Sequence, residues 1–374
     1  MTRARSVLIV GGGSAGNTLA ILLSNSGIAV DLVESRPDWG ALGSGILLHG
    51  NALRVLRDAG VWPQIHAAGF GFDSIGILAP DGTVIAEQPD LHSGGPELPS
   101  TLGILRPALQ QTLIDAVHAG GTRVRLGCTV QKLDDHGDGV EAVFSDGTAG
   151  RYDLVVGCDG IYSATRESIG VVERPEPTGM GVWRTLVPRP AELVRTDLAY
   201  GGPCYIAGYS PMSDDVAYAL LVVDWHERDE ADPADYAERM RAESAVYGGL
   251  WPRIREHITD PAAVHYTAFH RLLVEGPWHR GRIALAGDAV HACPPTLAQG
   301  VAMSLEDTAV LAELLTSRDV WDDALLTEYR DRRIPRVRTV VDGSMQLAQW
   351  LKEGNRQAAP ALIASILTAL TERP

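Results

Sequence analysis

Cysteine is scarce in this 374-residue chain, and no two cysteines stand close together in the sequence. There are four of them, at Cys128, Cys158, Cys204 and Cys293. Because none belongs to a C-x-x-C pair, the sequence predicts neither a zinc site nor a dithiol redox centre. We expect reduced, mostly buried thiols in a cytoplasmic protein.

Long apolar runs and an excess of positive charge are also missing. No segment approaches the roughly 20 apolar residues that a membrane helix needs, so we expect no membrane partner. The formal net charge of −15 would repel the phosphates of a nucleic acid, so we expect no nucleic-acid partner either. Apolar residues make up 45% and charged residues 21% of the chain, which is typical of a folded, soluble protein.

Several catalytic signatures are absent as well. The sequence contains no metal-ligand cluster, no G-x-S-x-G motif and no second glycine fingerprint for a resident nicotinamide dinucleotide. We therefore do not expect this chain to be a zinc enzyme or a serine hydrolase of the α/β type.

The first 34 residues carry a dinucleotide-binding pattern. A buried-strand run over Ser6–Val10 leads into Gly11-x-Gly13-x-x-Gly16, a helical stretch follows, and a second apolar strand ends at Glu34. In this pattern Gly11 permits a tight turn, Gly13 lets the backbone approach a pyrophosphate, and Gly16 lets the helix pack closely on the strand.

The helix after the first glycines and the acid at the strand end predict how a nucleotide binds. Ser14 and Ala15 open the helix, and free N–H groups together with the helix dipole favour a phosphate at such a terminus. Glu34 can accept hydrogen bonds from ribose hydroxyls, and its charge would repel a 2′-phosphate. The pattern predicts an ADP-like nucleotide but does not separate FAD from NAD.

Two later segments distinguish FAD from NAD. In residues 154–166, Asp159 and Gly160 follow an apolar strand, and in residues 282–300, Gly287 and Asp288 follow another. Together with the glycine fingerprint, these segments resemble the single-component FAD-dependent (group A) aromatic hydroxylases, of the p-hydroxybenzoate and salicylate hydroxylase type. The similarity runs from residue 7 to about residue 315.

The resemblance implies specific roles at the cofactor. Asp288 would bind the ribityl hydroxyls of FAD, and Arg106 would reach the phosphate–ribityl region. Asp159 would contribute structural hydrogen bonds to a motif shared by FAD and NAD(P)H. Each residue also has a plainer interpretation, since the two aspartates could simply cap helices and Arg106 could form a surface ion pair.

The loop from Pro294 and Pro295 to Gly300 would lie against the isoalloxazine ring. Here the chain departs from the family, which often has glycine where Ala298 stands and asparagine where Ala302 stands. A basic residue frequently follows the acid at the strand end, but here Ser35 does, with Arg36 displaced by one. We therefore assign Arg36 no adenine contact, and we expect His291 to order the loop rather than to transfer protons.

The predicted fold class is α/β, with a Rossmann-like FAD-binding domain interrupted by an antiparallel β-sheet substrate domain and followed by a helical C-terminus. The FAD-binding domain would comprise residues 1–74, 101–178 and 277–319. The substrate domain would comprise residues 75–100 and 179–276, and the C-terminal helices residues 320–374. We expect a monomer or a homodimer.

The resemblance also implies an activity. NADH or NADPH would reduce FAD, and O2 would then form a flavin C4a-hydroperoxide that hydroxylates a small aromatic or heteroaromatic substrate. The sequence identifies no catalytic side chain, because no motif marks one. Candidates for the substrate pocket on the second-domain strands are Arg184, Tyr205, Tyr209 and His270, although such strand residues more often serve packing.

Two other functions remain open at this point. A reductase or dehydrogenase on the same fold would need no O2, and a nonenzymatic flavin-binding module would not oxidise NAD(P)H.

Overall fold

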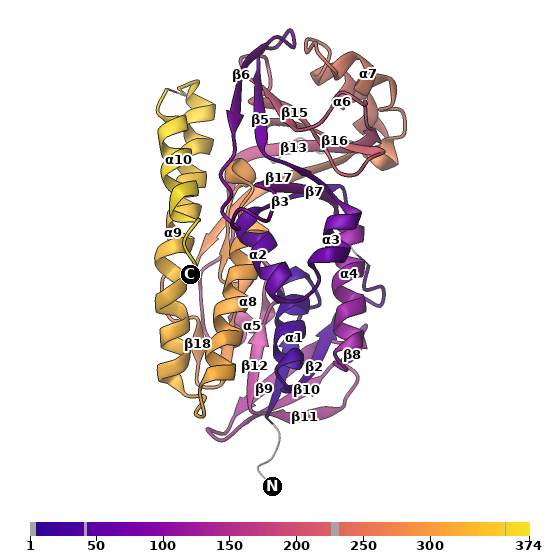
Figure 1. The fold of residues 1–374 in the computed structure, drawn as a ribbon. Coiled ribbons are helices and arrows are strands. Elements are labelled where there is room, and N and C mark those ends of the chain that lie inside the picture. Colours follow the sequence, from indigo (N-terminus) through magenta and orange to yellow (C-terminus); the bar gives the residue numbers. More distant parts are fainter. Residues whose placement is uncertain (1–4, 41–42, 226–231, 356) are drawn as a thin grey trace.

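A computed structural model describes residues 5–40, 43–225, 232–355 and 357–374. Its first layer is a six-stranded sheet in the order β18-β19-β12-β1-β2-β8, parallel except for β18 (Figure 1). These strands are β18 (His279–Arg280), β19 (Ile283–Leu285), β12 (Leu154–Gly157), β1 (Ser6–Val10), β2 (Ala29–Glu34) and β8 (Arg123–Leu126). Strands β1, β12 and β19 are apolar along almost their whole length because helices and strands cover both faces of a parallel sheet.

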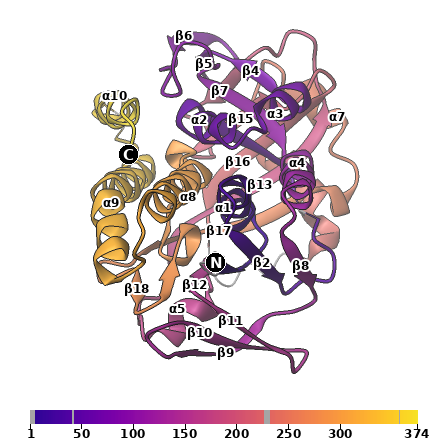
Figure 2. The same cartoon turned by 60° about the horizontal axis from the view of Figure 1, so that its bottom comes forward.

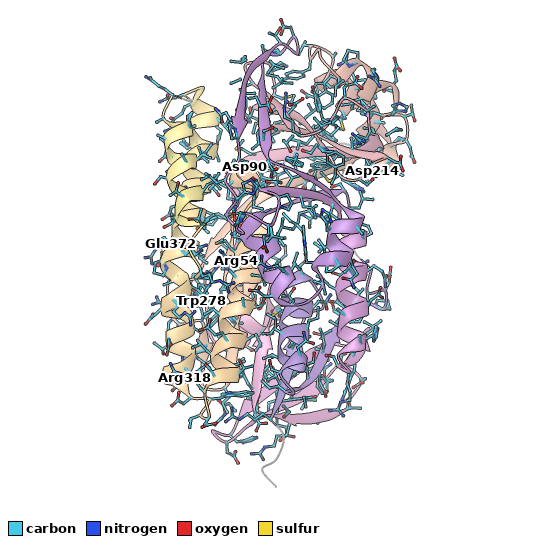
Figure 3. All side chains as sticks on the ribbon, in the orientation of Figure 1. Arg54, Asp90, Asp214, Trp278, Arg318 and Glu372 are labelled. Atoms are coloured by element: carbon cyan, nitrogen blue, oxygen red, sulfur yellow. The ribbon has the colours of Figure 1, made fainter. Side chains whose placement is uncertain are left out.

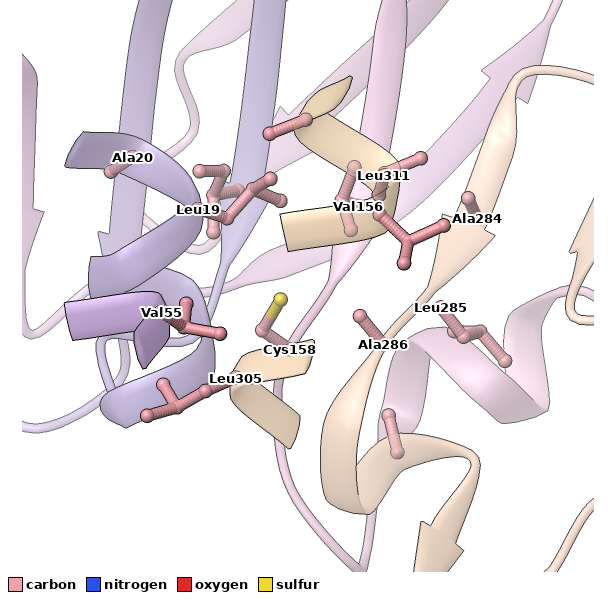
Figure 4. Close-up of a cluster of buried hydrophobic side chains, with 14 of the residues drawn as sticks. Leu19, Ala20, Val55, Val156, Cys158, Ala284, Leu285, Ala286, Leu305 and Leu311 are labelled. Atoms are coloured by element: carbon pink, nitrogen blue, oxygen red, sulfur yellow. The ribbon is translucent and has the colours of Figure 1, made fainter. Parts of the chain in front are cut away.

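Helices hold this sheet through a continuous core. Figure 4 shows Leu19 of α1 (Ser14–Asn25), Val156 of β12, Leu285 of β19 and Leu305 of α8 (Gly300–Ser317) around Cys158. All four apolar side chains are at most 1% exposed. Helices α4 (Arg106–Ala119) and α5 (Ala164–Ser168) complete this part of the chain.

A second, eight-stranded sheet lies above the first (Figure 1), in the order β20-β17-β13-β16-β15-β14-β5-β6. Its strand pairs are antiparallel except for β14 with β5. The strands are β20 (His291–Ala292), β17 (His265–Leu273), β13 (Glu176–Pro188), β16 (Val216–Asp224), β15 (Ile206–Pro211), β14 (Thr196–Ala199), β5 (Ser74–Leu78) and β6 (Val84–Pro89). One face packs against α6 (Tyr236–Glu243) and α7 (Trp251–Glu256), which leaves the other face for the rest of the molecule.

A small sheet that the sequence did not predict joins the two large ones. It consists of β3 (Gly45–His49), β7 (Thr101–Leu105) and β4 (Phe70–Phe72), flanked by α2 (Gly50–Asp58) and α3 (Trp62–Ala68). A Cβ atom on Gly103 would lie 2.0 Å from the carbonyl oxygen of Pro211, so only glycine permits this approach to β15. Figure 2 shows a further antiparallel sheet at the opposite end, formed by β9 (Val130–Asp135), β10 (Val140–Phe144) and β11 (Ala149–Tyr152).

The C-terminal part is helical. Helix α9 (Asp323–Glu353) runs along α8, and α10 (Ala359–Ala369) packs on α9 (Figure 1). The chain then returns to α2, where Arg54 donates hydrogen bonds to the carbonyl oxygens of Thr371 and Glu372 (Figure 3). The predicted fold class is confirmed, and no helix of the described residues is long and apolar enough to span a bilayer.

Candidate flavin-binding site

The glycine loop between β1 and α1 combines tightly packed glycines with one open glycine, Gly13. Gly11 has φ +105°, and a Cβ atom there would lie 2.5 Å from the carbonyl oxygen of Cys158. At Gly16 a Cβ atom would lie 1.9 Å from the carbonyl oxygen of Gly11. At Gly13, by contrast, no atom lies within 4 Å of the Cβ position. This open side, beside a helix N-terminus with no side-chain cap, fits a pyrophosphate.

Three side chains from outside the loop fix its backbone. Trp39 Nε1 and Gln110 Nε2 both donate to the carbonyl oxygen of Gly12, at 2.9 and 2.7 Å. The backbone N–H of Gly12 donates to Glu34 Oε2 at 2.9 Å. Sequence reasoning missed Trp39 and Gln110, because their roles depend on contacts between segments distant in the chain.

Glu34 also orders the backbone that follows β2. Its Oε1 atom accepts hydrogen bonds from the backbone N–H of Arg36 at 2.9 Å and from Ser35 Oγ at 3.2 Å. The carboxylate at the end of β2 therefore joins the glycine loop to the backbone that follows this strand.

Asp159 makes structural hydrogen bonds at the start of α5. Its carboxylate accepts from Ser163 Oγ, and from both the backbone N–H and Oγ1 of Thr165 at 2.9 Å. The buried Arg166 of the same segment donates to the carbonyl oxygen of Ala289 at 3.0 Å. The Asp159 segment thus supports the loop that carries Asp288.

Asp288 is solvent-accessible, yet the surrounding protein is dense enough for burial to raise the pKa of its carboxyl group. The charges of His291 and Arg106 oppose that rise. The carboxylate is therefore reachable from solvent although protein atoms crowd around it. A carboxylate in that position is a good acceptor for the hydroxyls of a polyol.

Arg106 is the first residue of α4, and its charge and that of Asp288 act on each other. Its backbone N–H donates to the carbonyl oxygen of Ser44 at 3.1 Å, and its Cδ lies 3.6 Å from the Cβ position of Gly43. Burial and the charge of Arg184 lower the pKa of Arg106, while Asp288 raises it. The structure therefore gathers Arg106, Arg184 and Asp288, from three distant segments, into one charged region.

A buried ionic network holds the Asp288 loop from behind. Asp307 of α8 accepts from the backbone N–H of Gly287 at 2.9 Å and lies 2.6 Å from His291 Nε2. Its other oxygen accepts from Arg333 Nε of α9 at 2.8 Å. Asp307 thus connects Gly287 and His291, which flank Asp288, to Arg333, and Asp307 and Arg333 are additional residues that the motifs did not reveal.

The preceding residue, Glu306, connects this network to Arg336 and Asn51. It accepts hydrogen bonds from Arg333 Nη1 at 3.0 Å, Arg336 Nε at 2.7 Å and Asn51 Nδ2 at 3.2 Å. Glu306, Asp307 and Arg333 are all fully buried. Buried charges of this kind are tolerated only when they are paired and hydrogen-bonded.

The network predicts loss of stability in acid. Burial alone would raise the pKa of Glu306 and of Asp307. Arg333 and Arg336 outweigh burial at Glu306, His291 and Arg333 outweigh it at Asp307, and both pKa values are lowered. Groups with a lowered pKa stabilise the fold above their unfolded pKa of about 4, and this contribution disappears as the pH falls through the folded value. Urea unfolding at pH 7 and below pH 4 should show this decline, and Glu306→Gln should make it shallower. An unchanged pH profile in Glu306→Gln would argue against the network.

The loop expected against the flavin ring has an unusual backbone. Pro295–Leu297 form a short 3-10 turn, and Ala298 follows with φ 50°. Within the described ranges, Ala298 is the only non-glycine residue with a positive φ. The family's frequent glycine at this position has a physical reason, since left-handed backbone costs alanine about 1 kcal/mol or more. Thr296 anchors the loop by donating to the carbonyl oxygen of Ser344 at 2.8 Å.

Of the four substrate-pocket candidates, Arg184 lies with the flavin-site residues. Strand register places Leu186 opposite Tyr218, so Arg184 shares the sheet face of Tyr218. Tyr218 is almost fully buried, and its hydroxyl interacts with Ser44 and Arg184. Tyr218 and Ser44 had no sequence signal, because only the meeting of β16 with the segment before β3 brings them here.

The structure does not bring the other three candidates to Arg184. Tyr209 lies opposite Ala219 on the other sheet face, where its ring packs edge-on against Trp251 with the ring centroids 6.1 Å apart. His270 stands three positions after Thr267 on β17, so the two side chains lie on opposite faces of the sheet. The ring of His270 lies against the exposed ring of Tyr162. Tyr205 contacts the carboxylate of Asp224 at the end of β16.

A separate surface cleft of about 290 Å³ lies between β13, β17 and α9. Its lining residues are Thr178, Arg271, Asp342, Met345, Gln346, Ala348, Gln349 and Lys352. None of the flavin-site residues lines this cleft, so it is separate from the candidate flavin-binding site.

Comparison with known proteins agrees with this site. Residues 4–344 match the family described as "FAD binding domain". The "Putative FAD-dependent monooxygenase YetM" of Bacillus subtilis is 30% identical over 98% of this chain and 99% of its own. The 3-amino-4-hydroxybenzoate 2-monooxygenase PtnB3 of Streptomyces platensis is 31% identical over 94% of this chain and 90% of its own.

Solved structures share the fold. Klebsiella pneumoniae HpxO, complexed with FAD and uric acid, covers 99% of this chain and 97% of its own, with a TM-score of 0.85 and 21% identity. The tetrameric 2-methyl-3-hydroxypyridine-5-carboxylic acid oxygenase covers 98% of this chain and 96% of its own, with a TM-score of 0.80 and 23% identity. Because the family model matches residues 4–344 and the two sequence relatives are at least 30% identical over most of the chain, this protein belongs to the FAD-binding-domain family of flavoprotein monooxygenases and is an FAD-dependent oxidoreductase.

Proposed function

We propose that this enzyme takes electrons from NADH or NADPH and uses O2 to hydroxylate a small aromatic or heteroaromatic compound. The observation that carries this proposal is that the Asp288 loop meets both the glycine loop and Arg106. The Cβ position of Gly287 lies 3.2 Å from Ala15 Cβ, and the charges of Arg106 and Asp288 act on each other. Relatives support the choice of a ring substrate, since they include a 3-amino-4-hydroxybenzoate 2-monooxygenase and a 3-hydroxybenzoate 6-hydroxylase.

The residues of the chain would divide the binding of one FAD among them. The N–H groups at Ser14, Ala15 and Gly16 would bind the pyrophosphate, with Glu34 at the adenosine ribose. Arg106 would reach the phosphate–ribityl region, Asp288 would accept bonds from the ribityl hydroxyls, and Asp159 would hold the neighbouring backbone. The loop from Pro295 to Gly300 would lie against the flavin ring. When bound, FAD supplies the hydride and oxygen chemistry, and the protein supplies position and exclusion of water.

The activity itself can be measured directly. The purified protein should show a flavin spectrum, and small ring compounds should accelerate NAD(P)H oxidation and yield a product heavier by one oxygen atom. A colourless protein that retains no FAD after reconstitution would contradict the proposal.

Two other results would point to the remaining alternatives. Anaerobic turnover without added oxygen would indicate a reductase or dehydrogenase. Full FAD occupancy without any NAD(P)H oxidation would indicate a nonenzymatic flavin-binding module.

A further inference from the structure

Gln299 joins the loop expected against the flavin ring to the start of α8. It follows Ala298 directly and is fully buried. Its Oε1 atom accepts a hydrogen bond from Asn51 Nδ2 at 3.0 Å. Among the residues that the structure describes, Gln299 Nε2 is buried and finds no acceptor. The bond to Asn51 therefore fixes this side chain at the end of the loop.

Asn51 is a fixed point on α2. It is fully buried, and its backbone N–H donates to Ser93 Oγ at 3.0 Å. The Nδ2 group that bonds Gln299 also donates to Glu306 Oε1 at 3.2 Å. Asn51 thus connects the end of the flavin loop with the buried carboxylate of α8.

The charge of Glu306 sets the direction of these amide bonds. Burial favours its neutral form, but Arg333 and Arg336 lower its pKa, so the side chain is a carboxylate at neutral pH. Because a carboxylate only accepts hydrogen bonds, Asn51 must turn its NH2 group toward Glu306. The second hydrogen of that group is then available for the oxygen of Gln299. The orientation of the Gln299 amide therefore follows from the charge on Glu306.

The segment after α10 holds the same network from the other side. Arg336 pairs with Glu306 and also donates to three carbonyl oxygens within residues 369–372, at 2.7–3.0 Å. Arg54 donates to two carbonyl oxygens of that segment at 3.2 Å, and its Nη2 atom lies 3.7 Å from Glu306 Oε1. Carbonyl oxygens at the end of a helix carry partial negative charge, so they stabilise both arginines beside Glu306.

The flavin loop needs a tether because Ala298 is strained. Its φ of 50° is unfavourable for alanine, and strained residues persist only where the surrounding structure holds them. Thr296 anchors one side of Ala298 by donating to the carbonyl oxygen of Ser344 at 2.8 Å. Gln299 anchors the other side through Asn51. Loss of the second anchor would let the loop relax.

We propose that Asn51 is a positioning residue for the flavin ring, on which it acts through Gln299 and the loop 295–300. This inference rests on the proposed function, which places the loop against the ring, and it adds a distant residue to that site. Residues 369–372 support the same tether, because they hold the arginines that pair with or lie beside Glu306.

The test replaces Asn51 and follows hydrogen exchange of the backbone amides of residues 296–300 in the FAD-bound enzyme. Asn51→Leu removes the donor, whereas Asn51→Asp keeps the shape but sets a second acid against Glu306. Because a hydrogen bond to a charged group is lost, the loop amides should exchange roughly tenfold to a hundredfold faster in Asn51→Leu. They should exchange faster still in Asn51→Asp. A packing role alone would give the opposite order, since aspartate is the closer match in shape.

The bound flavin provides a second measurement. Its visible circular dichroism and fluorescence should depart from native in the same order, while the amides of residues 11–16 keep their native exchange rates. Gln299→Met removes only the acceptor at the end of the loop and should accelerate the same amides, so it decides the matter if an Asn51 variant fails to fold.

Two further proteins complete the comparison. A chain stopped after Leu370 loses acceptors of Arg54 and Arg336, and it should show a smaller acceleration because Arg333 still pairs with Glu306. Asn25→Asp is the control, since this exposed side chain of α1 donates at 3.4 Å to a carbonyl oxygen outside the network. It should leave both the loop and the flavin signals native.

Three results would overturn the inference. One is native exchange of the loop in both the Asn51 and the Gln299 variants, and another is a milder effect of Asn51→Asp than of Asn51→Leu. The third is a faster loop with unchanged flavin signals. Failure of the proposed function is recognised separately in the native enzyme, as loss of FAD or absence of ring-stimulated NAD(P)H oxidation.

Discussion

Replacing Arg333 with methionine is expected to lower the free energy of unfolding by about 3–5 kcal/mol. Arg333 is fully buried between two fully buried carboxylates, Glu306 and Asp307, and contacts both at 2.8–3.0 Å. Methionine fills much of the volume of the arginine side chain but carries no charge. The two buried carboxylates then have less positive charge beside them in an environment of low dielectric constant. Urea unfolding of the FAD-saturated protein at pH 7 measures the loss.

Arg332 provides the matched control for this prediction. It precedes Arg333 on α9 but pairs with the exposed Glu313, so Arg332→Met should cost no more than about 1 kcal/mol. The double variant Arg333→Met/Asp307→Asn should lose less than the sum of the two single variants, because the residues are in direct contact. Equal losses in Arg332→Met and Arg333→Met would show that the buried network does not stabilise the fold.

Gly13→Ala and Gly16→Ala should separate FAD binding from folding. At Gly13 the new methyl group meets no protein atom within 4 Å, so the apoprotein should lose at most about 1 kcal/mol of stability. If the pyrophosphate occupies that open space, FAD affinity should still fall tenfold or more. At Gly16 the methyl group would lie 1.9 Å from the carbonyl oxygen of Gly11, so both stability and FAD affinity should fall.

The measurements are urea unfolding of the apoproteins and fluorescence titration with FAD. Gly276→Ala is a suitable control, because its Cβ position also has no neighbour within 4 Å but lies outside the glycine loop. Native FAD affinity in Gly13→Ala would mean that the dinucleotide does not lie along this side of the loop.

Local sequence patterns predicted the parallel sheet well, because both the strands and the glycine loop are short-range features. The run Ser6–Val10 forms β1 with the predicted bounds, and the fingerprint follows directly between β1 and α1. The small sheet of β3, β7 and β4 was missed, because its strands are short and acquire their pairing only from contacts across long loops.

The α/β fold, the dinucleotide fingerprint and the two aspartate motifs of a known flavoenzyme type could be recognised from local sequence patterns alone. Those features depend on periodicity and on fixed spacings between neighbouring residues. The folded chain was needed to show which of the strand candidates interacts with Arg106, and that Asp307 and Arg333 support the Asp288 loop. The physical reason is that sheet register and helix packing select which side chains share one buried space, and no local spacing encodes that choice.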